Sequence, residues 1–458
     1  MFQVKCTLFA KIGVFFCKTM CFSMDFKAVL CRICIFVGIK INILTMKKYL
    51  LLGLLCCGLQ ATMAQSALQG TWTGKLKTSA FELTVVLHAT PTEGKSMEFT
   101  LDSPDQNVKG IPMTTDYLSA DSLALSINQM DIHLRGHYQA DEISGTFLQN
   151  HFIFPLKMTR HEETISRPQT PQPPFPYTKQ EVVFENKKAG ASLAGTLTCP
   201  VNFKKGKTPV VLMVTGSGQQ NRDEEVFEHR PFAVIADYFA RHGIATLRYD
   251  DRNFGQSKGG DVAHATTQDF AQDAEAGIDY LKKQHEFGKI GVLGHSEGGN
   301  IAFILGAQQQ VDFIISMAAV GVKGDEALTE QVNKCMEIAG EKMRMTVAEY
   351  RKLNVGEHAP WLDYFLDYDP TRDLRHTTCP VFALNGDKDC QVIATQNLTA
   401  IREKLPINKA SQTKIYPQLN HLFQHCQSGL PAEYRQTAET IAPEVLTDMA
   451  KWINDLAK

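Results

Sequence analysis

A serine between glycines stands at residues 294–298, which read Gly-His-Ser-Glu-Gly. An apolar run, 289–293, precedes this segment, and a helix-forming run, 300–308, follows it. A sharp turn from strand to helix strains the serine backbone, and the flanking residues must be small to avoid clashes. The N-terminus of the following helix favours the negative charge that develops when a hydroxyl attacks a carbonyl. The pattern predicts that Ser296 is a nucleophile.

A serine hydroxyl is a weak nucleophile, so it needs a base, and the base needs an acid that orients it. The loop after the apolar run 381–384 offers two carboxylates, Asp387 and Asp389. A later loop, following the last apolar run, offers two imidazoles, His421 and His425. At this point the residue types leave both choices open.

Nucleophilic attack on a carbonyl places negative charge on one oxygen, and each N–H aimed at that oxygen contributes about 3–4 kcal/mol. One donor is expected to be the backbone N–H of Glu297, directly after the serine. The other is expected from residues 215–223, Thr-Gly-Ser-Gly-Gln-Gln-Asn-Arg-Asp, where Ser217 and Gly218 are the candidates. The glycines permit close backbone approach. A phosphate-binding loop is excluded because no Gly-Lys-Ser/Thr follows.

Short apolar runs separated by helical patterns fill residues 179–458. Such strands lack polar alternation, so both of their faces are buried, which predicts an α/β fold with a mostly parallel sheet covered by helices. The predicted strands span 182–184, 193–197, 209–215, 244–249, 290–293, 313–317, 381–384 and 413–416, and two of the predicted helices span 233–242 and 267–284.

Residues 321–370 interrupt this rhythm, because they favour helix and contain no predicted strand. An insertion here lies over the carboxyl ends of the strands, where ligand sites of α/β folds form. We expect a short helical cap. The alternative is an ordinary crossover helix with a long loop.

The residues before the α/β pattern alternate apolar and polar side chains, as in an antiparallel sheet with one buried face. They predict a small all-β domain over residues 65–163. A linker, 164–178, follows. Its five prolines favour an extended, semi-rigid chain.

The N-terminal region has the pattern of a secretory leader. Residues 46–64 begin with a methionine and two lysines, continue with an apolar run and end in small residues, which predicts a start at Met46 and cleavage after Ala64. A membrane anchor or a long signal including the apolar residues 1–45 is the alternative. The cysteines 56–57 follow bulky leucines, so lipid attachment is not expected. The mature protein is then expected to be secreted or periplasmic, with no stable membrane insertion.

Cysteine usage and charge exclude several classes of protein. The predicted mature chain keeps an odd, widely spread set of cysteines with no Cys-x-x-Cys pair, so neither a disulfide framework nor a zinc site is indicated, and no cofactor is expected. The net charge of -2 gives no general attraction to nucleic acid. The cysteines concerned are Cys199, Cys335, Cys379, Cys390 and Cys426.

The stretch 179–458 resembles the α/β-hydrolase superfamily, close to its secreted bacterial esterases and its serine-aminopeptidase-like branch. The resemblance rests on the serine segment, the loop 216–223, the residues 368–370 (Tyr-Asp-Pro) and the residues 385–389 (Asn-Gly-Asp-Lys-Asp). It does not extend to the predicted all-β domain.

The resemblance resolves the two open choices. The superfamily acid often occupies a Gly-x-x-Asp-x-x-Val turn, which residues 386–392 fit with Asp389, so Asp387 is expected only to close the turn. The superfamily base closely follows the last strand, which favours His421 over His425. His295 is expected to pack beside the serine turn.

A further loop, residues 249–257, resembles the superfamily pattern Asp-x-Arg-Gly-x-Gly-x-Ser, with Asn253 in place of a glycine. Asp250 and Arg252 are expected to brace the structure. Contact with substrate is the alternative for this loop.

The resemblance implies a serine hydrolase that cleaves carboxylic esters of small molecules through an acyl-enzyme. An exopeptidase or amidase with the same three residues is the alternative, in which Glu224, Glu225, Asp363 or Asp367 would form an acidic pocket for a substrate amine. A non-catalytic binding protein is a third hypothesis, opposed by the presence of candidates for all three roles. The sequence does not specify the oligomeric state.

Overall fold

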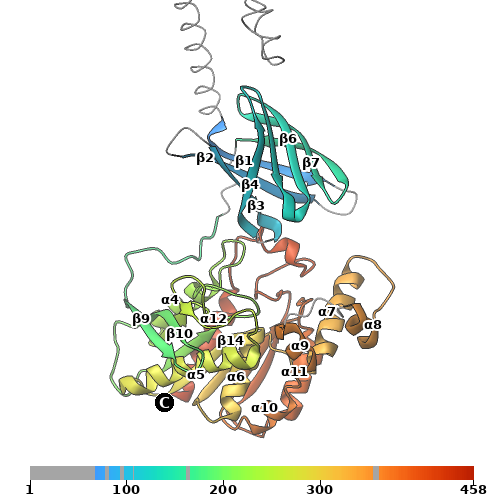
Figure 1. Ribbon diagram of the computed structural model, residues 1–458. Coiled ribbons are helices and arrows are strands. Elements are labelled where there is room, and N and C mark those ends of the chain that lie inside the picture. Colours follow the sequence, from blue (N-terminus) through green and yellow to red (C-terminus); the bar gives the residue numbers. More distant parts are fainter. Residues whose placement is uncertain (1–67, 78–81, 93–96, 107, 161–165, 354–359) are drawn as a thin grey trace, which may run out of the picture. The chain divides into compact units, whose positions relative to one another are not determined.

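The computed structural model describes residues 68–458 except 78–81, 93–96, 107, 161–165 and 354–359 (Figure 1). The predicted leader therefore lies outside the described residues. The chain divides into two compact units, one made of most of the N-terminal strands and one that contains residues 162–458. Each is considered by itself.

The N-terminal strands form a closed antiparallel barrel in which β1 pairs with β8 through Thr73 and Thr159. Alternate side chains point inward, as in β3 and β6, and Trp72 and Leu134 are fully buried inside. The predicted antiparallel all-β fold is confirmed, and it closes into a barrel. The elements are β1 (Gly70–Lys77), β2 (Glu82–Pro91), β3 (Met97–Ser103), η1 (Pro104–Gln106), β4 (Val108–Leu118), β5 (Ser122–Ile127), η2 (Asn128–Met130), β6 (Ile132–Gln139), β7 (Glu142–Gln149) and β8 (Phe152–Thr159).

The second unit contains a nine-stranded sheet in the order β13-β10-β12-β11-β14-β15-β16-β17, with β9 paired to β10. Six strands, β11, β12 and β14 to β17, run parallel, and the pairs involving β9, β10 and β13 are antiparallel. The predicted mostly parallel sheet is confirmed. Its strands are β9 (Thr178–Asn186), β10 (Ala191–Cys199), β11 (Val210–Val214), β12 (Ala245–Tyr249), β13 (Lys258–Gly259), β14 (Ile290–His295), β15 (Phe313–Met317), β16 (Val381–Gly386) and β17 (Gln412–Tyr416).

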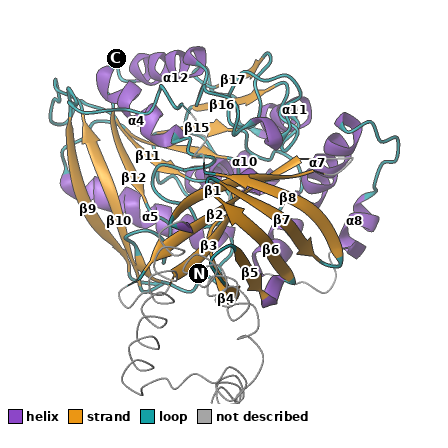
Figure 2. Ribbon diagram, turned by 90° about the horizontal axis from the view of Figure 1, so that it is seen from above, coloured by secondary structure: helices purple, strands orange, loops and turns teal. Residues whose placement is uncertain are grey.

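Helices cover both faces of this sheet (Figure 2). Side chains of β11 alternate between the two layers: Leu212 packs with α5 and α6, whereas Met213 packs with α4 and α12. Burial on both faces explains why β11 is apolar at every position. The helices are α4 (Pro231–Arg241), α5 (Thr267–Gln284), α6 (Glu297–Ala307), α10 (Thr371–His376), α11 (Ala394–Lys404) and α12 (Pro443–Leu456), and a 3-10 turn, η3 (Pro431–Glu433), precedes α12.

The predicted cap consists of three short helices between β15 and β16, namely α7 (Gly324–Ile338), α8 (Val347–Leu353) and α9 (Pro360–Asp367). An apolar cluster of Val320, Ala327, Phe365 and Val392 joins the cap to the residues after β15 and β16. The insertion is thus a helical cap and not a single crossover helix.

Candidate active site

Ser296 lies between the last residue of β14 and the first residue of α6, as the sequence predicts. Its backbone has φ 53° and ψ -120°, a strained conformation for a residue with a side chain. Glycine is required on both sides: a Cβ on Gly294 would lie 1.9 Å from the carbonyl oxygen of Gly298, and one on Gly298 would lie 2.2 Å from that of Val214. The tight turn holds the serine side chain where the sheet ends.

Asp389 and His421 are brought together from the loops after β16 and β17. Nδ1 of His421 lies 2.7 Å from Oδ2 of Asp389, and the two residues are only 5% and 2% exposed. The other carboxylate oxygen accepts hydrogen bonds from the backbone N–H groups of Gln391 and Val392, at 2.8 and 2.9 Å. These bonds hold the carboxylate in one orientation, and the carboxylate in turn orients the imidazole of His421.

The two rival residues lie elsewhere. Asp387 is exposed and accepts a hydrogen bond from the backbone N–H of Gln418, which closes the turn between the two loops. His425 is also exposed, and its ring nitrogens face Glu439 at 2.9 Å and Glu444 at 3.4 Å.

Ser296 and His421 line one cavity of about 400 Å³ below the cap. Its walls are mostly apolar or aromatic and come from the cap and from the loops after β11, β16 and β17. Such a pocket suits an uncharged organic group. The main wall residues are Val226, Phe227, Val320, Ala327, Leu328, Trp361, Phe365, Val392, Leu422 and Tyr434.

The predicted N–H donors belong to two segments, the start of α6 and the loop after β11. Glu297 begins α6, so its backbone N–H belongs to the helix N-terminus directly after Ser296. Ser217 lines the cavity, whereas Gly218 is not among the described residues that line it. Of the two candidates on this loop, Ser217 is the better placed.

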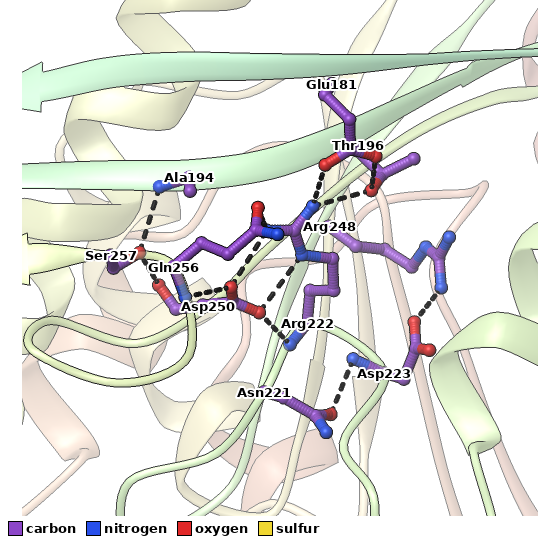
Figure 3. A network of polar contacts seen from close by, with 10 residues as sticks. All are labelled: Glu181, Ala194, Thr196, Asn221, Arg222, Asp223, Arg248, Asp250, Gln256 and Ser257. Atoms are coloured by element: carbon purple, nitrogen blue, oxygen red, sulfur yellow. Dashed lines mark hydrogen bonds and ion pairs between the residues drawn. The ribbon is translucent and has the colours of Figure 1, made fainter.

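The loop that carries Ser217 is held by the loop after β12. Figure 3 shows Arg222 beside Asp250, whose Oδ1 accepts hydrogen bonds from Arg222 N at 2.8 Å and Nε at 3.0 Å. Asp251 accepts hydrogen bonds from Gln220 N at 2.7 Å and from Thr215 Oγ1 at 3.1 Å. Burial raises the pKa of Asp251 to about 8.

The expected bracing by Asp250 and Arg252 agrees with these contacts. Arg252 forms a buried ion pair with Asp273 of α5, with a separation of 2.7 Å between Nε and Oδ2. Neither Asp250 nor Arg252 is among the described residues that line the cavity. The loop after β12 thus positions the loop after β11.

Sequence reasoning missed the role of the Glu297 side chain. Its buried carboxylate accepts hydrogen bonds from Thr267 Oγ1 at 2.6 Å and from Trp361 Nε1 at 2.8 Å. Burial raises the pKa of this carboxyl group. Because Trp361 belongs to α9 and lines the cavity, the residue after the serine anchors the cap. No local pattern signals this contact, since the two residues are 64 positions apart.

Within the described residues, no group of three or more His, Cys, Asp or Glu side chains could hold a metal ion. The five cysteines that the structure describes are all free thiols. No described helix is long and apolar enough to span a bilayer.

Comparison with known proteins gives several matches, and the family match lies within the second unit. Residues 228–382 match the family described as serine aminopeptidase, S33. Esterase EstD of Thermotoga maritima is 24% identical over 283 residues, which cover 59% of this chain and 68% of that protein. An acyl transferase of Photobacterium phosphoreum is 28% identical over 103 residues, which cover 22% of this chain and 33% of that protein.

Solved structures are similar at lower identity. Est1E from Butyrivibrio proteoclasticus has 17% identity and a TM-score of 0.43, with 61% of this chain and 99% of that chain covered. A Pyrococcus furiosus esterase has 15% identity and a TM-score of 0.43, with coverage of 65% and 100%. The family match includes Ser296 but ends before Asp389 and His421, so the roles of these two residues depend on the geometry described above.

Proposed function

Because the chain belongs to the α/β-hydrolase superfamily, we propose that its second unit hydrolyses carboxylic esters with Ser296, His421 and Asp389 as a catalytic triad. One observation supports this most directly. Ser296 and His421 line the same cavity, while Nδ1 of His421 is bound to the buried carboxylate of Asp389. A serine hydroxyl needs a base beside it and a carboxylate that orients this base, and these contacts support the assignment of both roles.

The proposed reaction begins at the imidazole of His421. As a carboxylate, Asp389 accepts hydrogen bonds and donates none, so Nδ1 of His421 carries the proton. Nε2 is then left to accept the proton of Ser296. The serine oxygen then attacks the ester carbonyl, and the N–H groups of Glu297 and Ser217 stabilise the oxyanion. His421 returns the proton to the departing alcohol, leaving an acyl-serine. Water, activated by the same imidazole, releases the acid and restores the serine.

The charges around the cavity favour an ester over a substrate with a free amine. Among the described residues that line the cavity, Glu224 is the one carboxylate, and it is already bonded to His295 and to the N–H of Gly216. Glu225 pairs with Arg230, and Asp367 pairs with Arg351.

Asp363, the fourth acidic candidate, is not among the described residues that line the cavity. An aminopeptidase needs an available carboxylate for the substrate ammonium group, because a buried unpaired charge is costly. None of the four acidic candidates meets this requirement.

The test compares an aryl acetate with an aminoacyl anilide of similar size. We expect kcat/KM on the acetate to exceed that on the anilide by at least roughly 100-fold, since the ammonium group finds no counter-charge. Equal values, or a preference for the anilide, would favour the exopeptidase hypothesis.

Replacing Asp389 with Asn is expected to lower kcat by roughly 10⁴-fold, because the amide holds the imidazole in the wrong tautomer without moving it. Steady-state kinetics on an aryl acetate would measure the loss. Asp387→Asn is the matched control, and its activity should stay within about twofold of wild type, since this exposed residue only closes a turn. A larger loss of kcat in Asp387→Asn than in Asp389→Asn would mean that Asp387 orients the imidazole and Asp389 closes the turn.

A further inference from the structure

A second imidazole lies beside that of His421. His295, the residue before the serine, is buried, and its ring centroid is 4.7 Å from that of His421. Its Nδ1 lies 2.9 Å from Oε1 of Glu224, and its Nε2 lies 2.9 Å from the carbonyl oxygen of His421. Both nitrogens of this ring are therefore engaged.

The partners determine the protonation state of His295. A carbonyl oxygen only accepts, so Nε2 must carry a hydrogen. Oε1 of Glu224 also accepts the backbone N–H of Gly216 at 2.9 Å, as expected of a carboxylate oxygen that faces two donors. With Glu224 as a carboxylate, which only accepts hydrogen bonds, Nδ1 carries a hydrogen as well. A neutral imidazole has only one N–H, so His295 is an imidazolium whose charge is balanced by Glu224.

Electrostatics agree with this assignment. Burial alone acts to lower the pKa of His295, but the charge and hydrogen bond of Glu224, the bond to His421 and the nearby charge of Asp389 together raise it. Among the described residues, the titratable or charged groups that act on the ring are Glu224, His421 and Asp389, Asp251 lies near Glu224, and Phe423 makes an aromatic contact with the ring.

We infer that Glu224 and His295 form a positioning pair for the proposed ester hydrolysis, locking three loops together at their point of convergence. Through the Gly216 N–H the pair holds the loop that presents Ser217, and through the His421 carbonyl it holds the loop that presents the base. His295 itself belongs to the serine turn. This inference rests on the proposed function, because the loops matter to catalysis only if they carry the oxyanion donor and the base.

The side chain of Glu224 is held inside the protein. The residue is only 3% exposed, and its Oε1 contacts both His295 and the backbone N–H of Gly216. A buried carboxylate is stable only with such partners.

The pair predicts a particular dependence of activity on pH. The folded-state pKa of His295 is raised, so the Nε2 hydrogen bond to the His421 carbonyl persists until the pH rises through that value and is then lost. In Glu224→Gln the amide oxygen can still accept hydrogen bonds from Gly216 and His295, but burial without a counter-charge leaves His295 neutral, with one ring hydrogen for two acceptors. The bonds from His295 to residue 224 and to the His421 carbonyl then cannot both be made at any pH.

The experiment measures kcat/KM on an aryl acetate across pH for wild type, Glu224→Gln and His295→Gln. We expect wild type to exceed Glu224→Gln about tenfold near pH 7, the effect of one charge-assisted hydrogen bond, and to fall to the level of this variant in alkaline buffer. His295→Gln should lack the same alkaline change, because it has no titrating ring. A ratio of wild type to Glu224→Gln that stays constant with pH would reduce the pair to a structural contact and overturn the inference.

Nitrogen-15 spectra of the histidine rings provide a readout that is independent of turnover. In folded wild type and in the inactive Ser296→Ala variant, His295 should show two ring N–H groups, assigned by their loss in His295→Gln. A single ring N–H would overturn the inference even if Glu224→Gln failed to fold. If Ser296→Ala kept its activity, the proposed function would fail instead, whatever the spectra of His295 showed.

Discussion

Ser296→Ala is expected to lower kcat on an aryl acetate by roughly 10⁴- to 10⁶-fold. The variant removes one oxygen from a half-buried position and keeps the backbone of the turn, so the free energy of unfolding should change by less than about 1 kcal/mol. The remaining activity should come from N–H groups that still stabilise the oxyanion and from substrate binding in the cavity. A variant that kept most of its turnover would reject Ser296 as the nucleophile.

A fluorophosphonate probe separates loss of chemistry from loss of structure. It should label folded wild type at Ser296, located by peptide mass spectrometry, and leave Ser296→Ala unlabelled. Absence of labelling in correctly folded wild type would support the hypothesis of a non-catalytic binding protein. Labelling at another serine would place the nucleophile elsewhere.

The serine turn could be predicted because its tightest constraint is local. A side chain on Gly294 would clash with the backbone of Gly298, four residues further on, so the residue pattern carries this part of the geometry, whereas Gly298 is required by the backbone of Val214 in β11. The order of elements after residue 179 was equally predictable, since strands buried on both faces leave continuous apolar runs.

Closure of the N-terminal strands into a barrel was not predicted. Alternation shows that one face of each strand is buried, but it does not show whether the first and last strands pair. The register Thr73 to Thr159 joins residues 86 positions apart, and no local signal encodes it.

The positioning groups were missed for the same reason. The sequence predicts Glu224 only as a candidate ligand for an amine and His295 only as a packing residue, because their contact joins residues 71 positions apart. Arg222 was likewise not singled out, although it fixes the loop that carries Ser217 to Asp250. Sequence patterns identify reactive groups through local constraints, whereas the groups that hold them are specified by tertiary contacts.

His421→Gln is expected to lower kcat by roughly 10⁶-fold, as much as removal of the nucleophile, because an unassisted serine hydroxyl is a poor nucleophile. His425→Gln is the matched control, four residues away on the same loop. Its exposed contacts with Glu439 and Glu444 contribute little, so its turnover should stay within about threefold of wild type.

The double variant Ser296→Ala/His421→Gln gives the sharper test of whether the two residues act as a unit. If His421 acts only by taking the proton of Ser296, its removal costs nothing once the serine hydroxyl is absent, and the double variant should be no slower than Ser296→Ala. Losses that multiplied would mean that His421 works independently of Ser296, for example by activating water directly. If His421→Gln kept its activity and His425→Gln lost it, the exposed His425 would be the base. The 2.7 Å contact between His421 Nδ1 and Asp389 Oδ2 argues against this outcome.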